Sequence, residues 1–222
     1  MAPPTATGDG TIRINGQPGP RRIKIAAFRC PSDPGTGGVA WTLLDGTRVT
    51  GQAPNTGYAP TNYVGSIGAT TRFGGTPKRG IFVQNTCYGI RDILDGTSNT
   101  LAVSECVIGF YRANTNDTAD RAPCTAETPK QTNSTYVSGY SWFYAYFPFE
   151  AFFNTYVGPN SAMADCGQNT DRANSAARSL HVGGVQALMA DGSVRFIGDS
   201  IDVNMTWPAL GDMSDGNIIG EY

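Results

Sequence analysis

Residues 181–196 read His181-Val-Gly-Gly-Val-Gln-Ala-Leu-Met-Ala-Asp191-Gly192-Ser-Val-Arg-Phe196, and this stretch predicts a β-hairpin. Two apolar runs, 185–190 and 193–198, flank Asp191-Gly192. That dipeptide favours a two-residue type I′ turn, because both central positions need positive φ. A hairpin closed there pairs Met189 with Val194 and Ala187 with Phe196. The four side chains then share one apolar face with Val185, so the register and the turn agree.

Further motifs lie along the rest of the chain. They are Phe28-Arg-Cys30-Pro31-Ser32-Asp33-Pro34, Asn62-Tyr63-Val-Gly-Ser-Ile-Gly68, Ile93-Leu-Asp95-Gly96-Thr97-Ser98-Asn99-Thr100 with Glu105 following, and Trp207-Pro-Ala-Leu210 to Gly220-Glu221. In this order, and with His181 nine residues ahead of Asp-Gly, they resemble the bacterial H-X9-DG family with prepilin-type N-termini. That family is similar to type II secretion pseudopilins, and the resemblance covers residues 24–222.

The resemblance implies a structural role for the motif residues. These are His181, Gly183, Gly184, Asp191, Gly192, Asp95, Gly96, Thr97, Ser98, Asn99, Asn62 and Glu105. The chain departs from the family at two places. It has Ser179-Leu180-His181-Val182 where the family usually has Ser-Arg-His-Pro, and it begins Met1-Ala-Pro-Pro without the family's basic leader and long apolar helix. A mature form, a truncated form and a start site downstream of the leader are all consistent with that beginning.

The hydropathy pattern predicts an α+β, β-rich fold with an antiparallel sheet, short helices and long loops. The resemblance implies that this fold is a pseudopilin-like head. The chain contains 28 Gly and 14 Pro, which disfavours long helices. We expect an extended or flexible segment over 1–22 and a single head domain over 23–222 with a polar insertion at 113–139. Strands are predicted at 23–28, 63–67, 80–84 and 100–108, a second hairpin within 39–50, and short helices at 175–180 and 201–210.

Composition excludes some function classes. Only 15% of residues are charged and the net charge is −2, so the basic excess of a nucleic-acid-binding protein is missing. No window of 18 apolar residues predicts a transmembrane span. Basic residues crowd the N-terminal part and acidic residues the last 24 positions. This asymmetry fits two solvated surfaces, two chain ends paired within one fold, or head-to-tail contact between subunits.

The single histidine is the natural catalytic candidate, but the sequence favours a structural role for it. Asp191 is used by the turn, and a strand between them separates it from His181 by up to roughly 30 Å. No Gly-x-Ser-x-Gly motif presents a nucleophile. We therefore expect no enzyme, and expect His181 to bind backbone at the base of the hairpin. Glu105 lies on an apolar strand and needs a partner if buried, for which Arg91 and Arg195 are the candidates.

The five cysteines include no Cys-x-x-Cys pair, and one histidine does not complete a zinc site of usual spacing. The resemblance implies export, which favours disulfides. Candidate pairs are Cys124 with Cys166 and Cys87 with Cys106, which leaves Cys30 unpaired.

Eleven of the 23 aromatic residues fall within 136–156. Three interpretations stay open for this segment: a core strand with a rim, a subunit interface, or a stacking platform for a sugar or pigment. The interface candidates are Trp142, Tyr144, Phe147 and Phe149.

No cofactor is predicted, with calcium as the single candidate ion. The pseudopilins that the chain resembles bind calcium in a C-terminal loop, and Asp212, Ser214 and Asp215 supply oxygen ligands there. The predicted function is a non-enzymatic assembly subunit of the bacterial cell envelope or surface, extracytoplasmic, with copies of itself or other envelope subunits as partners. A solute- or glycan-binding module that uses residues 136–156 is the alternative. The head alone is expected to be monomeric or weakly associating.

Overall fold

The computed structural model describes residues 23–34, 59–71, 73, 80–109, 138–139, 141–143, 151–163, 165–169, 172–217, 219, 220 and 222. It also describes short strands at 5–6, 12–14, 17–18, 40–42, 48–50 and 112–114. Side chains within these six strands, and at 166–169 and 172, are outside the description.

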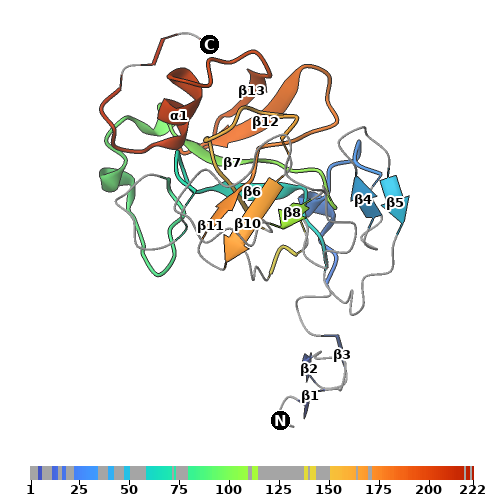
Figure 1. The fold of residues 1–222 in the computed structure, drawn as a ribbon. Coiled ribbons are helices and arrows are strands. Elements are labelled where there is room, and N and C mark those ends of the chain that lie inside the picture. The colour runs from blue at the N-terminus through green and yellow to red at the C-terminus, as the bar shows by residue number, and fades with distance from the viewer. Residues whose placement is uncertain are drawn as a thin grey trace.

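A five-stranded sheet forms the centre of the fold, in the order β13-β12-β7-β6-β9. Its strands are β6 (Tyr63–Ser66), β7 (Leu101–Glu105), β9 (Phe152–Phe153), β12 (Gly184–Met189) and β13 (Val194–Gly198). All neighbouring strands are antiparallel except β6 and β9. With one α-helix and many loops in the described chain, the predicted β-rich α+β class is confirmed (Figure 1).

The helix α1 (Thr206–Gly211) packs on this sheet through Trp207 and Leu210, which are fully buried in the same cluster as Val185 and Ile197. The Trp207 ring stacks on Phe153 with 6.2 Å between ring centroids. Its indole Nε1 donates to the carbonyl oxygen of Val157 at 2.8 Å, which satisfies the polar end of a buried aromatic side chain. Burial of this aromatic pair therefore joins α1 to the edge strand β9.

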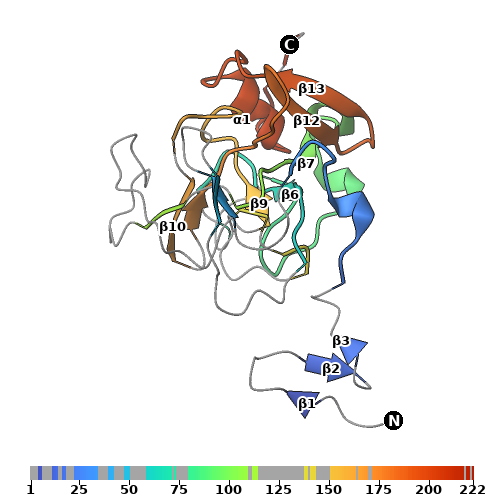
Figure 2. The same ribbon diagram turned by 90° about the vertical axis from the view of Figure 1, so that its right-hand side faces the viewer.

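Smaller sheets complete the described structure. β1 (Thr5–Ala6), β2 (Ile12–Ile14) and β3 (Gln17–Pro18) form an N-terminal sheet, which lies apart from the main sheet in Figures 1 and 2. β4 (Ala40–Thr42) and β5 (Arg48–Thr50) pair antiparallel on either side of Asp45-Gly46, which confirms the predicted second hairpin. A third sheet has the order β11-β10-β8, from β8 (Arg112–Asn114), β10 (Asp165–Asn169) and β11 (Arg172–Asn174).

Four local predictions were wrong. Residues 23–28 form the 3-10 turn η2 (Ala26–Phe28), and 80–84 contribute only a bridge between Val83 and Thr86. Residues 175–180 form no helix, because their backbone amides bind distant groups: Ala176 donates to Asp165 and Arg178 donates to Glu105. The last helix begins at Thr206, not at 201.

The strand predicted at 63–67 is present as β6 and that at 100–108 as β7. Two further 3-10 turns are η3 (Ile90–Asp92) and η4 (Thr97–Asn99).

The hairpin β12–β13 exists, but its predicted register and turn type were wrong. Leu188 faces Val194 and Val185 faces Ile197, one position away from the expected pairs. Gly192 has φ +89° while Asp191 is not among the residues with positive φ, so the turn is not type I′. Met189 accepts from Gly192 N at 3.0 Å and donates to Ser193 O at 2.8 Å, which closes a three-residue loop ending in a left-handed glycine.

The shifted register changes which apolar residues are buried. Ile197 joins Val185 on the inner face, whereas Val194 and Phe196 lie on the outer face with Leu188. Their exposed fractions are 64%, 49% and 36% respectively. The outer face of this hairpin is thus more apolar than predicted.

Replacing Gly192 by Val is expected to lower the free energy of unfolding by about 1–3 kcal/mol, because a β-branched residue is strained at positive φ. An added Cβ meets nothing within 4 Å, so the cost comes from the backbone alone. Urea denaturation measures it. Gly192→Asn is the matched control, since Asn tolerates the left-handed region and should retain most of the stability. Equal losses in the two variants would contradict the assigned conformation.

Candidate functional site

Four motif residues from distant parts of the sequence meet at one end of the main sheet, where its central strand β7 ends. Asn62 immediately precedes β6, Glu105 is the last residue of β7, and His181 lies just before β12. Because β7 runs antiparallel to both β6 and β12, its end lies beside the beginnings of those two strands. Cys30 follows η2 and reaches the same place through the loop 29–34. The topology of the sheet therefore explains why these separate motifs come together.

Glu105, His181 and Cys30 form a compact cluster of chemically active side chains. His181 Nε2 lies 3.2 Å from Glu105 Oε1 and 3.8 Å from Cys30 Sγ. All three candidate ligand atoms lie within 4.8 Å of one another. Glu105 is buried with an exposed fraction of 4%, whereas His181 keeps 38% of its side chain exposed. In the part of the chain that is described, no other group of three His, Cys, Asp or Glu side chains is gathered in this way.

The partner of Glu105 differs from both predicted candidates. Its Oε1 faces His181, and its Oε2 accepts from the backbone N–H of Gln186 at 2.8 Å. Neither Arg91 nor Arg195 fills that role; Arg195 donates to the hydroxyl of Tyr222 at 2.7 Å. His181 was expected to bind backbone at the base of the hairpin, but its ring faces a carboxylate and a thiol. The backbone N–H of His181 makes a local hydrogen bond, donating to Ser179 Oγ at 3.1 Å.

Asn62, which is 1% exposed, fixes the loop that carries Cys30. Its Oδ1 accepts from Cys30 N at 3.0 Å and from Arg29 Nε at 3.2 Å. Its Nδ2 donates to Asp33 Oδ2 at 2.6 Å and to Cys106 O at 3.0 Å. A single amide therefore joins the Cys30 loop to the end of β7. Burial raises the pKa of the adjacent Cys106 thiol well above its usual value, with Asp33 adding to that shift.

A buried ion pair lies close to Glu105. Arg178 Nη2 contacts Asp165 Oδ1 at 2.9 Å, and both side chains are at most 4% exposed. Asp165 also accepts from Ser138 Oγ at 2.8 Å, while the backbone N–H of Arg178 donates to the carbonyl oxygen of Glu105 at 2.8 Å. Arg178 and Asp165 were not expected from the sequence, and Cys30 was expected to be the unpaired cysteine. The Cys30-Pro31-Ser32-Asp33 motif was the available signal for the loop.

The Asp95–Thr100 motif forms a turn that also ties down two distant loops. Gly96 has φ +93°, and its carbonyl oxygen accepts from Thr100 Oγ1 at 3.1 Å. The two carboxylate oxygens of Asp95 accept from the backbone N–H groups of Asp215 and Gly216 at 2.7 and 2.9 Å. The backbone N–H of Asp191 donates to Thr97 O at 3.0 Å, so the two Asp-Gly motifs lie side by side. Within the same turn, Asn99 and Ser98 belong to η4.

The double glycine ahead of β12 is required by geometry. Gly183 has φ +85°, and its carbonyl oxygen accepts from Asp199 N at 2.8 Å. A Cβ at Gly184 would lie 2.1 Å from the carbonyl oxygen of Ile197, so no larger residue fits there. The Asp191 carboxylate closes the other end of the hairpin by accepting from Ser193 N and Oγ at 2.8 and 2.6 Å. These hydrogen bonds lower the pKa of Asp191, the side-chain one most strongly.

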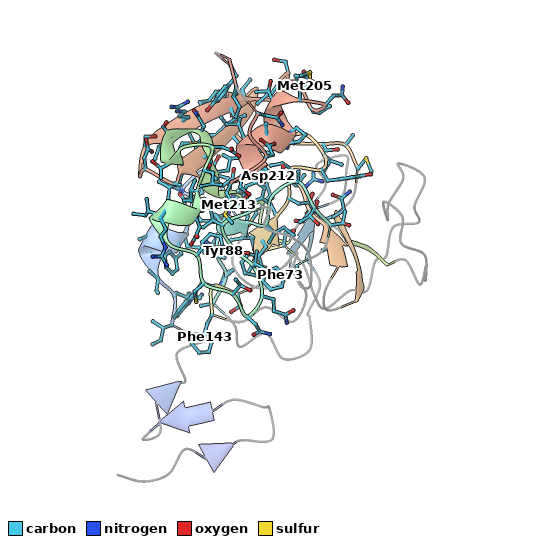
Figure 3. The ribbon with its side chains drawn as sticks, turned by 90° about the vertical axis from the view of Figure 1, so that its left-hand side faces the viewer. Phe73, Tyr88, Phe143, Met205, Asp212 and Met213 are labelled. Carbon is cyan, nitrogen blue, oxygen red and sulfur yellow. The ribbon has the colours of Figure 1, made fainter. Side chains whose placement is uncertain are left out.

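The predicted calcium ligands are engaged within their own turns. Asp212 Oδ1 accepts from Ser214 N at 3.2 Å, and the Asp215 carboxylate accepts from Asn217 N and Nδ2, each at 2.7 Å. Asp212 lies beside buried Met213 in the body of the molecule, while exposed Met205 lies at its periphery (Figure 3). The calcium hypothesis gains no support from this arrangement.

The described residues include part of the aromatic segment 136–156. Trp142 is half-buried, with its Nε1 donating to Ile23 O at 2.8 Å and its ring 5.9 Å from that of Phe28. Tyr144, Phe147 and Phe149 lie outside the described residues, whereas Phe153 belongs to the core as the first interpretation expected.

The predicted Cys87–Cys106 bridge was wrong: both thiols are free, the first exposed and the second buried with its Sγ donating to Thr61 O. Cys124 and the side chain of Cys166 lie outside the described residues, so that pair stays a prediction.

Two cavities differ greatly in size. The one beside Cys30, Glu105, Asn62 and Arg178 has a volume of about 10 Å³, which is the room that one water molecule needs. The other, about 460 Å³, lies between α1 and the C-terminal segment and includes Met205, Pro208 and Asp215 in its wall. Trp142 does not line it.

Fold and site together define a β-rich α+β domain whose loop motifs converge on a partly buried, hydrogen-bonded cluster at one end of the central strand of a mixed sheet. The chain belongs to the family described as protein of unknown function (DUF1559), whose model matches residues 3–204. The match includes most of the segment 1–22 that the sequence analysis set apart from the head. No curated protein and no solved structure matches the chain. Among the described residues, no helix has the length and apolar character needed to cross a membrane.

Proposed function

We propose that the chain is a non-enzymatic structural subunit of the bacterial cell envelope or surface, a pseudopilin-like head that assembles with copies of itself. The supporting observation is the way in which the motif residues are engaged. Their polar side chains hold separate loops together, and the space beside them, about 10 Å³, is too small for an organic substrate. Hydrogen bonds that fix the loops in this way suit a subunit that presents a rigid surface to its neighbours.

The assembly surface in this proposal is the apolar strip formed by Leu188, Val194 and Phe196 on the outer face of β12–β13. β13 is an edge strand of the main sheet, and a long apolar edge is a template for pairing with another chain. The occupant we assign is a second copy of this chain, because an edge strand is self-complementary when two copies pair antiparallel around a two-fold axis. Such pairing would place the two apolar strips side by side.

Replacing Phe196 by Asp is expected to abolish concentration-dependent self-association, which sedimentation velocity measures. Wild-type association should be weak, since burying one large apolar side chain contributes only about 1.5–3 kcal/mol. Val203→Asp is the matched control, because Val203 is 43% exposed but lies outside the strip. The proposal fails if the wild-type chain stays monomeric at the highest soluble concentration, or if both variants associate as the wild type does.

A solute-binding module remains the second candidate, and the 460 Å³ pocket beside α1 is the observation that favours it, because its volume falls in the range of small-molecule sites. The pocket is not the aromatic platform expected from residues 136–156. A ligand-dependent rise in melting temperature that is lost in Pro208→Trp, a substitution that fills this pocket, would favour this candidate over assembly.

A further inference from the structure

The geometry points to a transition-metal site at Cys30, Glu105 and His181, with Zn²⁺ as the ion. This inference is independent of the assembly proposal, since it concerns the end of the central strand β7 and not the outer face of the hairpin β12–β13. It also differs from the sequence-based expectation of no zinc site, which rested on the lack of a Cys-x-x-Cys pair and on the single histidine. Cys30 and His181 are 151 positions apart.

The orientation of the histidine separates a metal site from a nucleophilic triad. In a triad the base uses one ring nitrogen for the nucleophile and the other for the carboxylate. Here the same atom, His181 Nε2, faces both Glu105 Oε1 at 3.2 Å and Cys30 Sγ at 3.8 Å. A ring nitrogen aimed between a carboxylate oxygen and a sulfur is the arrangement of a ligand that shares one ion with them.

The spacing of the three atoms fits tetrahedral coordination. Zinc bonds are about 2.3 Å to sulfur and about 2.0–2.2 Å to nitrogen or oxygen, which puts neighbouring ligand atoms about 3.4–3.6 Å apart. The two separations from His181 Nε2, 3.2 and 3.8 Å, bracket those values, and all three ligand atoms lie within 4.8 Å of one another, so modest side-chain shifts admit the ion.

Donor type and charge select the ion. A thiolate, an imidazole and a carboxylate together suit Zn²⁺, whereas Ca²⁺ and Mg²⁺ prefer oxygen ligands alone. The thiolate and carboxylate supply two negative charges, which a divalent cation neutralises. Glu105 is 4% exposed, so an ion beside it compensates a carboxylate that is costly to bury.

Surrounding hydrogen bonds hold the ligands in place, as metal sites require. Gln186 N donates to Glu105 Oε2, which leaves Oε1 directed at His181. Asn62 fixes the backbone of Cys30, and Ser32 Oγ lies 3.0 Å from the Cys30 sulfur. Three protein ligands leave a fourth position for water.

The test is a titration of the reduced, chelator-treated full chain with Co²⁺ and then Zn²⁺. We expect one Co²⁺ per chain, with a thiolate-to-cobalt charge-transfer band in the near ultraviolet and intense visible bands of tetrahedral coordination, all displaced by Zn²⁺. Zn²⁺ should also raise the melting temperature.

Cys30→Ser and Glu105→Gln are expected to weaken binding by at least about 100-fold, more than the loss of an outer-shell partner costs. Cys87→Ser is the matched control, because Cys87 is a free, exposed thiol away from the cluster, and it should bind like the wild type. Circular dichroism establishes that each variant is folded. Absence of the charge-transfer band in the wild type, or its persistence in Cys30→Ser, would overturn the site.

Discussion

Arg178→Met is expected to lower the free energy of unfolding by about 3–5 kcal/mol, because it leaves the Asp165 carboxylate buried without its counter-charge. The two side chains are at most 4% exposed, and Arg178 reaches the carboxylate through Nε and Nη2 at 3.1 and 2.9 Å. Urea denaturation followed by circular dichroism measures the loss. Arg91→Met is the matched control: Arg91 is exposed, and its replacement should change stability by no more than about 0.5 kcal/mol.

A double variant distinguishes the effect of losing the ion pair from the effect of changing the size of the side chain. Asp165→Leu combined with Arg178→Met removes both charges, and replacing a buried pair by apolar groups is often close to neutral. We therefore expect the double variant to be more stable than Arg178→Met alone. If the loss of stability in the double variant equals the sum of the losses in Arg178→Met and Asp165→Leu, the two side chains act independently and the ion pair is not the source of the effect.

The sequence predicted the fold class well because hydropathy patterns report local burial. Residues 101–105 begin with the apolar run Leu-Ala-Val and become β7, and the apolar-rich run 185–189 becomes most of β12. The hairpin register was missed because Asp191-Gly192 fits two loop types. A two-residue loop needs positive φ at both positions, while a three-residue loop needs it only at the glycine. The hydrogen bonds of Ala190 and Asp191 to Thr100 and Thr97 hold the turn from outside the hairpin, and no local pattern contains them.

Several residues of the site were identified singly from the sequence, but their meeting in one cluster was not predicted. Asn62, Glu105 and His181 were each identified, yet their meeting depends on the antiparallel order β12-β7-β6, which a single sequence does not state. The partner of Glu105 was sought among arginines because a charged partner is the usual answer for a buried carboxylate. The structure supplies instead a histidine and a backbone N–H. Arg178 was missed because it lies in a stretch that was predicted to be a short helix.

Asn62→Ala is expected to lower the free energy of unfolding by about 3–4 kcal/mol, at roughly 1 kcal/mol for each of four lost hydrogen bonds. The side chain is 1% exposed, so water does not readily replace those bonds. Its removal leaves Cys106 O and Asp33 without the amide that now donates to them. Thermal and urea unfolding measure the loss. Asn204→Ala, an exposed asparagine, is the control and should be nearly neutral.

The same substitution connects stability to the proposed metal site. Asn62 holds the backbone N–H of Cys30 at 3.0 Å, so without it the Cys30 loop loses the contact that sets the position of the sulfur. We expect folded Asn62→Ala to bind Co²⁺ about 10–100-fold more weakly than the wild type, the usual cost of removing an outer-shell partner, with the charge-transfer band retained at saturation. Cys30→Ser removes the band itself because it removes the ligand. Unchanged Co²⁺ affinity in folded Asn62→Ala would show that Cys30 is positioned by other contacts, and that Asn62 serves the fold alone.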